Sequence, residues 1–290
     1  RRLYDRLVAL RTRADSAEVD LDEQDRYWLD EHIREFERSG ILLDADAQQR
    51  LRKLNVELAS LSVAFEQALV EGRNAAAVLV TDPTELTGFS EDEIAAARQA
   101  ARAREQEGWL IELTNTTGQP VLENLTNRDL RRRVLEASLN RCSGSDSTGT
   151  HATITRIAEL RATKAKLLGF SSFSAWALSD QMAQRPEAVL RLVDQLAPAC
   201  RAKVAKDAAE LQAFAQKTEG KEFKLEAWDW DYYAERLKKE KFDLNESDLK
   251  PYFVLDSILE NGIFFAANRL YGLTFKPRPD IPVYADGVKV

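Results

Sequence analysis

The sequence is poor in the residues that bind metals, form disulfides or interrupt helices. Its 290 residues include only two cysteines, two histidines and one methionine, with 12 glycines and 8 prolines. Two cysteines cannot build a disulfide framework, so we expect free thiols and a cytoplasmic protein. The low content of glycine and proline leaves long stretches in which helices can form, and therefore favours a mainly helical fold.

Long apolar runs and an excess of positive charge are also missing. No run of about 18 apolar residues occurs, so we expect no membrane span. The net charge of −7, from 41 basic and 48 acidic residues, argues against a surface that neutralises nucleic-acid phosphates. The run Arg131-Arg132-Arg133 is interpreted as a solvated helix face. We expect neither nucleic acid nor a membrane among the partners.

The two ends of the sequence have the features of a cut chain. It opens on the helical pattern "RRLYDRLVAL" without a methionine, and its only methionine is Met182. It closes on "VYADGVKV", a strand-like stretch for which no partner strand is apparent. We therefore expect a fragment of a longer protein, in which core exposed by the truncation favours self-association.

The spacing of apolar residues predicts helices over most of the chain. Within residues 45–71, apolar side chains recur every three or four positions, and Gly72 is expected to end this helix. Ser90 and Glu93 form the pattern of a capping box at the start of a further helix, and Asn127 is suited to cap the helix predicted to follow it. The run 109–114 is strand-like. The other predicted helices cover residues 2–13, 21–38, 90–108, 127–141, 152–168, 173–181, 186–220 and 255–270.

One flexible segment interrupts these helices. The stretch "SGSDSTGT" at 143–150 is rich in serine and glycine, which is typical of a linker. It predicts a subdomain boundary between residues 1–142 and 151–290. The expected fold class is thus all-α, mainly helical with minor short strands.

The sequence contains weak candidates for a metal or nucleophile site. His32 lies three residues before Glu35, but the second histidine of a zinc motif is missing, and His151 has no such neighbour. We interpret both histidines as surface or boundary residues. The stretch "GFSSF" at 169–173 lacks the second glycine of a nucleophile elbow, and its serines are suited to cap the next helix. We predict no catalytic residue and no metal ligand.

The stretch "WDWDYY" at 228–233 allows two interpretations. Asp229 and Asp231 are two positions apart, so on a helix they would point about 200° apart and could not act as a carboxylate pair. One of them can cap the helix that follows, which makes the stretch a structural junction. Alternatively, Trp230, Tyr232 and Tyr233 form part of a substrate-channel wall, because such side chains offer rigid, partly polar surfaces.

Several stretches resemble one enzyme family. The sequence over residues 40–290 is similar to the thimet-oligopeptidase-like zinc metallopeptidases, and it resembles the bacterial peptidyl-dipeptidases among them. Upstream of residue 40 only the helical character is similar. The resemblance is carried by "NRDLRRRVLEASLNR" (127–141), "IAELRATKAKLLGF" (157–170), "MAQRPEAV" (182–189), "WDWDYY" (228–233), "LKPYF" (249–253) and "FFAANRLYGLTF" (264–275).

The resemblance implies a two-lobed helical peptidase whose channel admits oligopeptides. In that family, two histidines of an H-E-x-x-H motif and a further glutamate bind zinc, and the motif glutamate is the general base. These residues have no counterpart in the present sequence, so the missing C-terminal catalytic half is an expected partner. We expect zinc in the full-length parent but none in this fragment, which is predicted to be inactive alone. The alternative is a non-enzymatic helical scaffold that binds peptides or a protein.

Overall fold

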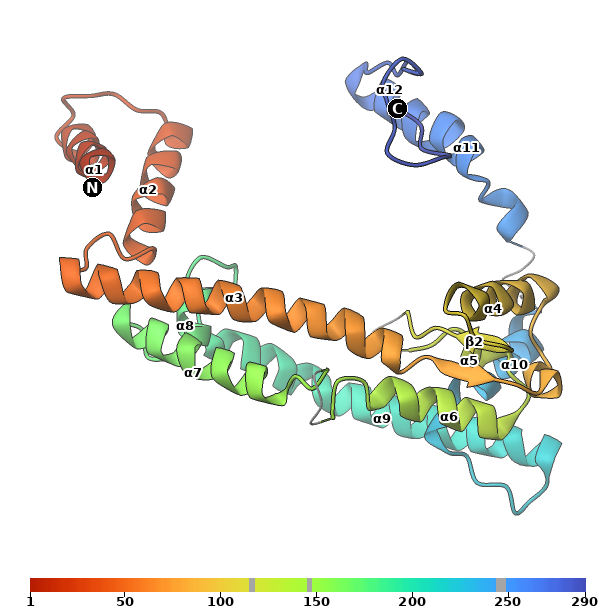
Figure 1. The fold of residues 1–290 in the computed structure, drawn as a ribbon. Coiled ribbons are helices and arrows are strands. Elements are labelled where there is room, and N and C mark those ends of the chain that lie inside the picture. Colours follow the sequence, from red (N-terminus) through yellow and green to blue (C-terminus); the bar gives the residue numbers. More distant parts are fainter. Residues whose placement is uncertain (115–117, 145–147, 244–248) are drawn as a thin grey trace. The chain divides into compact units, whose positions relative to one another are not determined.

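The computed structural model describes residues 1–114, 118–144, 148–243 and 249–290, and divides them into two compact units. Unit 1 comprises Arg1–Tyr233 and unit 2 comprises Ala234–Val290. These described residues are mainly helical with one two-stranded sheet, which confirms the predicted fold class (Figure 1). The predicted boundary at 143–150 stays a prediction, and its residues 145–147 lie outside the described part. No helix that the structure describes is long and apolar enough to cross a bilayer.

Unit 1 begins with helices that lie side by side. Helix α1 packs against α2, and α3 lies alongside α7, as Figure 1 shows. Arg38 at the end of α2 holds α8, because its guanidinium donates to the hydroxyl of Ser179 at 2.8 Å and to the carbonyl of Trp176 at 3.0 Å. The elements of this part are α1 (Arg2–Asp15), α2 (Glu23–Arg38), α3 (Ala45–Ala75), α7 (His151–Leu167) and α8 (Phe173–Leu178).

A small sheet organises the hydrophobic core of unit 1. Strand β1 (Val78–Val80) pairs antiparallel with β2 (Trp109–Ile111), and α4 (Glu91–Ala103) packs on β2. Gly108 enters β2 with φ +114°, and a Cβ there would approach the Val80 carbonyl oxygen to 2.4 Å. Glycine is therefore required at this close approach. The core residues are Val78, Val80, Leu86, Ile111, Leu113, Leu122, Leu125, Leu130 and Val134.

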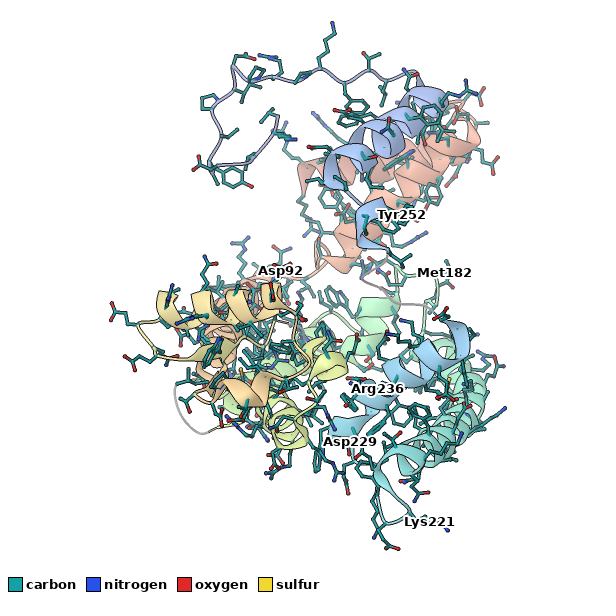
Figure 2. The ribbon with its side chains drawn as sticks, turned by 90° about the vertical axis from the view of Figure 1, so that its right-hand side faces the viewer. Asp92, Met182, Lys221, Asp229, Arg236 and Tyr252 are labelled. Atoms are coloured by element: carbon teal, nitrogen blue, oxygen red, sulfur yellow. The ribbon has the colours of Figure 1, made fainter. Side chains whose placement is uncertain are left out.

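The remaining elements connect this core to the end of unit 1. They are η1 (Pro83–Leu86), α5 (Val121–Asn124), α6 (Arg128–Leu139), α9 (Pro186–Glu219), η2 (Ala227–Asp229) and α10 (Trp230–Phe242), of which α10 continues into unit 2. Unit 2 also contains η4 (Lys250–Tyr252), α11 (Leu255–Ser257), the π-helix η5 (Ile258–Phe264) and α12 (Phe265–Tyr271). Figure 2 marks Met182 before α9, Lys221 after it, and Tyr252 in η4.

Local capping signals are confirmed. The Ser90 hydroxyl accepts from the amide of Glu93, whose carboxylate accepts from the amide of Ser90, so the capping box is complete. Asn127 accepts from the amide of Leu130 at 2.9 Å at the start of α6. The serine that precedes α8, Ser172, accepts from the amide of Ala175. These contacts need only neighbours in the sequence, which is why the sequence predicts them.

Three predicted elements differ from the structure. The helix predicted over 90–108 ends at Ala103, as α4, before it reaches Gly108. Helix α3 continues through Gly72 to Ala75, because Gly72 lies against Cys142 and lets the two backbones come close. Residues 283–290 form no strand, and the neighbouring segment offers only isolated backbone contacts, such as the bond from the Arg278 amide to the Val290 carbonyl. Strand β1, by contrast, was not predicted, since three residues are too few to show an alternating pattern.

Candidate functional site: a buried ion and aromatic junction

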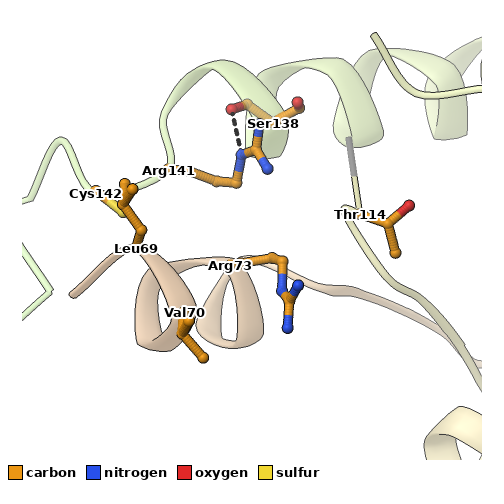
Figure 3. A pocket seen from close by; sticks show the side chains of 7 residues that line it. All are labelled: Leu69, Val70, Arg73, Thr114, Ser138, Arg141 and Cys142. Carbon is orange, nitrogen blue, oxygen red and sulfur yellow. Dashed lines mark hydrogen bonds between the residues drawn. The ribbon is translucent and has the colours of Figure 1, made fainter. Parts of the chain in front are cut away.

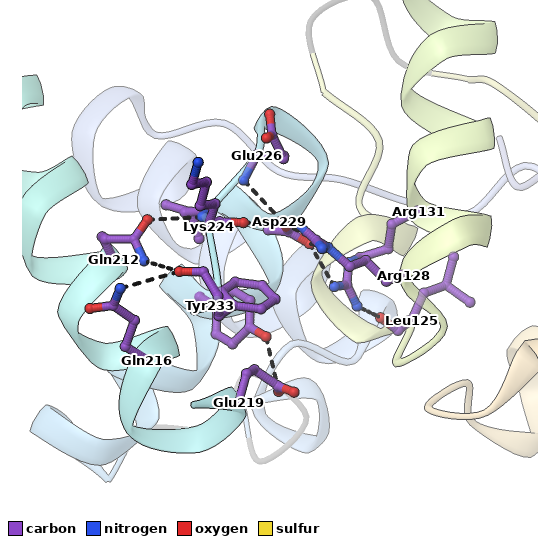
Figure 4. A network of polar contacts seen from close by, with 12 residues as sticks. Leu125, Arg128, Arg131, Gln212, Gln216, Glu219, Lys224, Glu226, Asp229 and Tyr233 are labelled. Carbon is purple, nitrogen blue, oxygen red and sulfur yellow. Dashed lines mark hydrogen bonds and ion pairs between the residues drawn. The ribbon is translucent and has the colours of Figure 1, made fainter. Parts of the chain in front are cut away.

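Asp229 is the centre of a buried polar network at the start of α10. Its side chain has no exposed surface. One carboxylate oxygen accepts from an Arg131 nitrogen at 2.8 Å, and the other accepts from Arg128 at 2.7 Å (Figure 4). The second oxygen also accepts from the backbone amide of Glu226 at 3.0 Å, which caps η2. Asp229 thus joins α6 to the first turn of α10.

The protonation of Asp229 follows from these partners. Burial by itself would raise the pKa of the carboxyl group, because it removes water from the charged form. The hydrogen bonds from Arg128 and Arg131 and from the Glu226 amide act in the opposite direction, and the net pKa of Asp229 is lowered. The group is therefore an anion at neutral pH, held between two guanidinium groups.

Arg131 is almost completely enclosed. It is 1% exposed and also donates to the carbonyls of Leu125 at 2.7 Å and Thr126 at 3.1 Å. Its guanidinium carbon lies 4.0 Å from the centre of the Tyr232 ring, a cation–π contact. The interpretation of Arg131-Arg132-Arg133 as a solvated face is therefore wrong for Arg131. Consecutive helical residues point about 100° apart, so the first arginine faces inward while Arg132 is exposed.

Tyr233 anchors an aromatic cluster next to this network. It is 2% exposed, and its hydroxyl donates to a Glu219 carboxylate oxygen at 3.0 Å. Its ring meets those of Phe214, Phe223 and Tyr232 edge-on, with centroids 6.4, 5.5 and 5.0 Å away. Burial, followed by the bond to Glu219, raises the pKa of Tyr233 well above its ordinary value. The hydroxyl therefore stays protonated at neutral pH.

The loop between α9 and η2 is fixed from both sides. Gln212 and Gln216 of α9 donate to the carbonyl of Phe223 at 2.8 and 3.2 Å. From α6, the Arg128 guanidinium lies 4.5 Å from the Phe223 ring centre and donates to the Lys224 carbonyl at 2.9 Å. The loop thus links α9, α6 and α10 into one structural junction.

The three aromatic residues predicted to line a channel wall differ in how deeply they are buried. Tyr233 is enclosed, whereas Trp230 and Tyr232 are half-buried. A surface that binds a substrate needs exposed atoms, which Trp230 and Tyr232 retain and Tyr233 hardly has. Asp229, which carries most polar contacts of the junction, was considered only as a cap. The assignment of the three aromatic residues to a channel wall stays a prediction.

A hollow of about 400 Å³ lies elsewhere in unit 1, between the end of α3 and the end of α6 (Figure 3). The Arg141 guanidinium at its edge donates to the carbonyls of Ser138 at 3.0 Å and Leu113 at 3.2 Å. Through these bonds, Arg141 fixes the backbone at Ser138 and Leu113. The hollow is lined by Leu69, Val70, Arg73, Thr114, Ser138, Arg141 and Cys142.

The two histidines lie on different helices. His32 is on α2, with Nδ1 3.8 Å from a Glu35 carboxylate oxygen, and His151 begins α7. In the parts of the chain that the structure describes, no three His, Cys, Asp or Glu side chains gather as metal ligands.

Comparison with known proteins identifies the family. The model of "Peptidase family M3" matches residues 121–290. A dipeptidyl carboxypeptidase of Escherichia coli is 41% identical over 256 residues, which cover 88% of this chain and 37% of that protein. The chain belongs to peptidase family M3. The predicted family resemblance is thereby confirmed.

Further M3 relatives match a similar stretch. A dipeptidyl carboxypeptidase of Salmonella typhimurium is 39% identical over 93% of this chain and 40% of its own length. Oligopeptidase A of Salmonella typhimurium is 33% identical over 90% of the chain and 39% of its own length. This M3 chain thus spans about two fifths of the length of these curated relatives.

Proposed function

We propose that this chain is part of a zinc-dependent M3 peptidase that hydrolyses oligopeptides and releases dipeptides from their C-termini. The observation that supports this is the 41% identity to a dipeptidyl carboxypeptidase over 88% of the chain. The identity to oligopeptidase A is lower, at 33%, which favours the dipeptide-releasing activity over that of oligopeptidase A. The two free cysteines support a reducing, cytoplasmic setting.

The residues of this chain do not fit a catalytic zinc. A zinc site needs at least three protein ligands that converge on one point. His32 and His151 lie on different helices, and the sequence contains no H-E-x-x-H motif. We therefore assign the zinc ligands and the general base to M3 polypeptide beyond these residues, and no catalytic residue to this chain.

The role we assign to the chain is that of a scaffold beside the substrate. The Asp229 network and the Tyr233 cluster hold α6, α9 and α10 together, which supports a rigid wall in this region. Trp230 and Tyr232 retain exposed surface and would contact the peptide, with Tyr233 behind them as support.

The test compares two proteins on one synthetic oligopeptide. The complete protein from the reading frame that contains this sequence is expected to release C-terminal dipeptides, and a chelator should abolish the release. Residues 1–290 by themselves are expected to release none, with products followed by mass spectrometry. Chelator-sensitive cleavage by residues 1–290 would overturn the proposed role. A complete protein that binds the peptide without cleaving it would favour a peptide-binding scaffold instead.

A further inference from the structure

Helix α9 has two halves with opposite environments. In its C-terminal half, Leu211 is 4% exposed and Ala215 is fully buried. In its N-terminal half, every residue from 189 to 206 is exposed. Eighteen consecutive helical residues without a buried member are unusual in a helix that is half apolar, because a globular helix normally buries its apolar face.

The apolar residues of the exposed half form one stripe. From Val189 the stripe proceeds in steps of four, three, four and four residues, which keeps its members on one helix face. Leu190 and Leu192 widen it on either side and are 59% and 56% exposed. The members of this stripe, called the α9 stripe below, are Val189, Val193, Leu196, Cys200 and Val204.

The α9 stripe continues into the buried half of the same helix. The next steps of four, three and four residues lead from Val204 through Ala208 to Leu211 and Ala215. The face that is buried at Leu211 is therefore the face that is bare at Leu196. Arg191 points away from this face, since it lies about 160° around the helix from both Val189 and Val193. Asp194 lies at the edge of the stripe, about 100° from Val193.

Two observations indicate what covers the α9 stripe. The stripe is continuous with an intramolecular core, which favours burial within the same protein over a contact with an unrelated partner. The M3 relatives are also much longer, since this chain spans 37% of the E. coli dipeptidyl carboxypeptidase. A contiguous exposed apolar face is the usual mark of an interaction site.

We propose that the α9 stripe is covered by an apolar, helix-compatible surface of the M3 polypeptide that lies outside residues 1–290. This inference rests on the proposed function in one respect, because both require further peptidase polypeptide. It adds the face of contact, which the family assignment does not give. Leu196 and Cys200 are near the middle of the α9 stripe.

Cys200 provides a reporter within the stripe. Its thiol is exposed, whereas the other cysteine, Cys142, is buried. In the complete protein, maleimide labelling of Cys200 is expected to be at least tenfold slower than labelling at position 202 in the double variant Cys200→Ala/Ala202→Cys. Position 202 is exposed and lies on the opposite side of the helix, since two residues rotate by about 200°. Peptide mapping separates the label on Cys142.

The reference measurement uses residues 1–290. There the two positions are expected to react at similar rates, because both are exposed within unit 1. Selective protection of Cys200 in monomeric residues 1–290 would assign the cover to unit 2 and overturn the proposal. If this chain does not hold its fold by itself, the comparison of the two positions within the complete protein still decides. Equal rates at the two positions of the complete protein would overturn the proposal, as would a reading frame that ends at Val290.

A second copy of the chain is the competing occupant. It would make Cys200 protection in residues 1–290 depend on protein concentration, together with a dimer in light scattering, and that result would also overturn the proposal. Peptide cleavage separates the two inferences: an active complete protein with a reactive Cys200 would leave the proposed function standing and remove only the docking face.

Discussion

At the residue scale, Asp229 and Asp231 are a natural pair for comparison. Asp229 is bound by two arginines and an amide, so its pKa is lowered, whereas burial raises the pKa of Asp231. The protein therefore stabilises the charge at one position and opposes it at the other, although both are aspartates of the same short stretch.

Asp229→Asn is expected to lower the free energy of unfolding by about 3 kcal/mol, because the enclosed Arg131 would lose the charge that compensates its burial. The exposed Arg128 would lose its ion pair as well. Urea denaturation of residues 1–290 measures this change. Asp231→Asn is the matched control and should change stability by less than about 0.5 kcal/mol or raise it slightly. Equal losses in the two variants would contradict the role of the buried ion pairs.

The same comparison predicts a pH dependence. Because the pKa of Asp229 is lower in the folded state, its contribution is fully present above the ordinary aspartate pKa of about 3.9. As the pH falls below that value the unfolded state takes up the proton first, and the contribution is lost as the pH passes through the folded-state pKa. The stability difference between the wild type and Asp229→Asn should thus be constant from pH 5 to 7 and shrink below about pH 4. A difference that grew on acidification would refute this assignment.

Trp230 and Tyr232 allow a test of the channel wall. If Trp230 contacts the peptide, Trp230→Ala in the complete protein should raise KM several-fold, since an aromatic contact surface is lost. Trp28→Ala is the control, because Trp28 is an exposed tryptophan on α2. Steady-state kinetics with one oligopeptide give both values, and thermal unfolding shows whether the fold is kept. An unchanged KM in Trp230→Ala would leave the residue with a packing role only.

At the scale of elements, the contact between α3 and the turn after α6 depends on a small residue. A Cβ at position 72 would lie 2.3 Å from the Cys142 Sγ, while the next atoms of Cys142 are 3.5 and 3.6 Å away. Alanine is a better helix former than glycine by about 1 kcal/mol, so helix propensity and packing act in opposite directions here.

Gly72→Ala is expected to destabilise the protein by about 1–3 kcal/mol, because the overlap with Sγ exceeds the gain in helix propensity. The double variant Gly72→Ala/Cys142→Ala removes Sγ and should be more stable than Cys142→Ala by up to about 1 kcal/mol. Urea denaturation of the four proteins gives the coupling energy. Additive effects would show that the two residues do not meet.

The elements also show where prediction from sequence works. Ser90 with Glu93, Asn127 and Ser172 were identified because a cap involves residues three positions apart. The expectation that Gly72 would end its helix was wrong, since the sequence alone does not show that Cys142 lies opposite this glycine. A short strand such as β1 is defined by its partner β2 and has almost no pattern of its own.

At the scale of the whole molecule, the two units differ in how much core they contain. The buried hydrophobic residues that the structure describes all belong to unit 1. In unit 2, large apolar side chains such as Tyr252, Phe253 and Tyr284 are 77%, 67% and 93% exposed. The described residues of unit 2 include no buried apolar side chain, and a region with so few buried groups opens locally at a low free energy.

Limited digestion of residues 1–290 with chymotrypsin should therefore cut first after Tyr252, Phe253 and Tyr284. Tyr233 is buried and serves as the internal control, since it should be cut only when unit 1 unfolds. Mass spectrometry of early time points identifies the order of cleavage. Early cleavage after Tyr233 would contradict the structural division.

The sequence by itself determined the helical class, the helix caps and the M3 resemblance, because these depend on composition, on neighbours three or four positions apart and on short ordered motifs. Only the tertiary structure decided that Arg131 is buried on Asp229, that α3 passes through Gly72, and that the face of α9 is covered at Leu211 but bare at Leu196. Each of these depends on a residue about 70 to 100 positions away, or on whether any neighbour is present at all. Residues so far apart in the sequence are brought together by tertiary packing, which short sequence patterns do not specify.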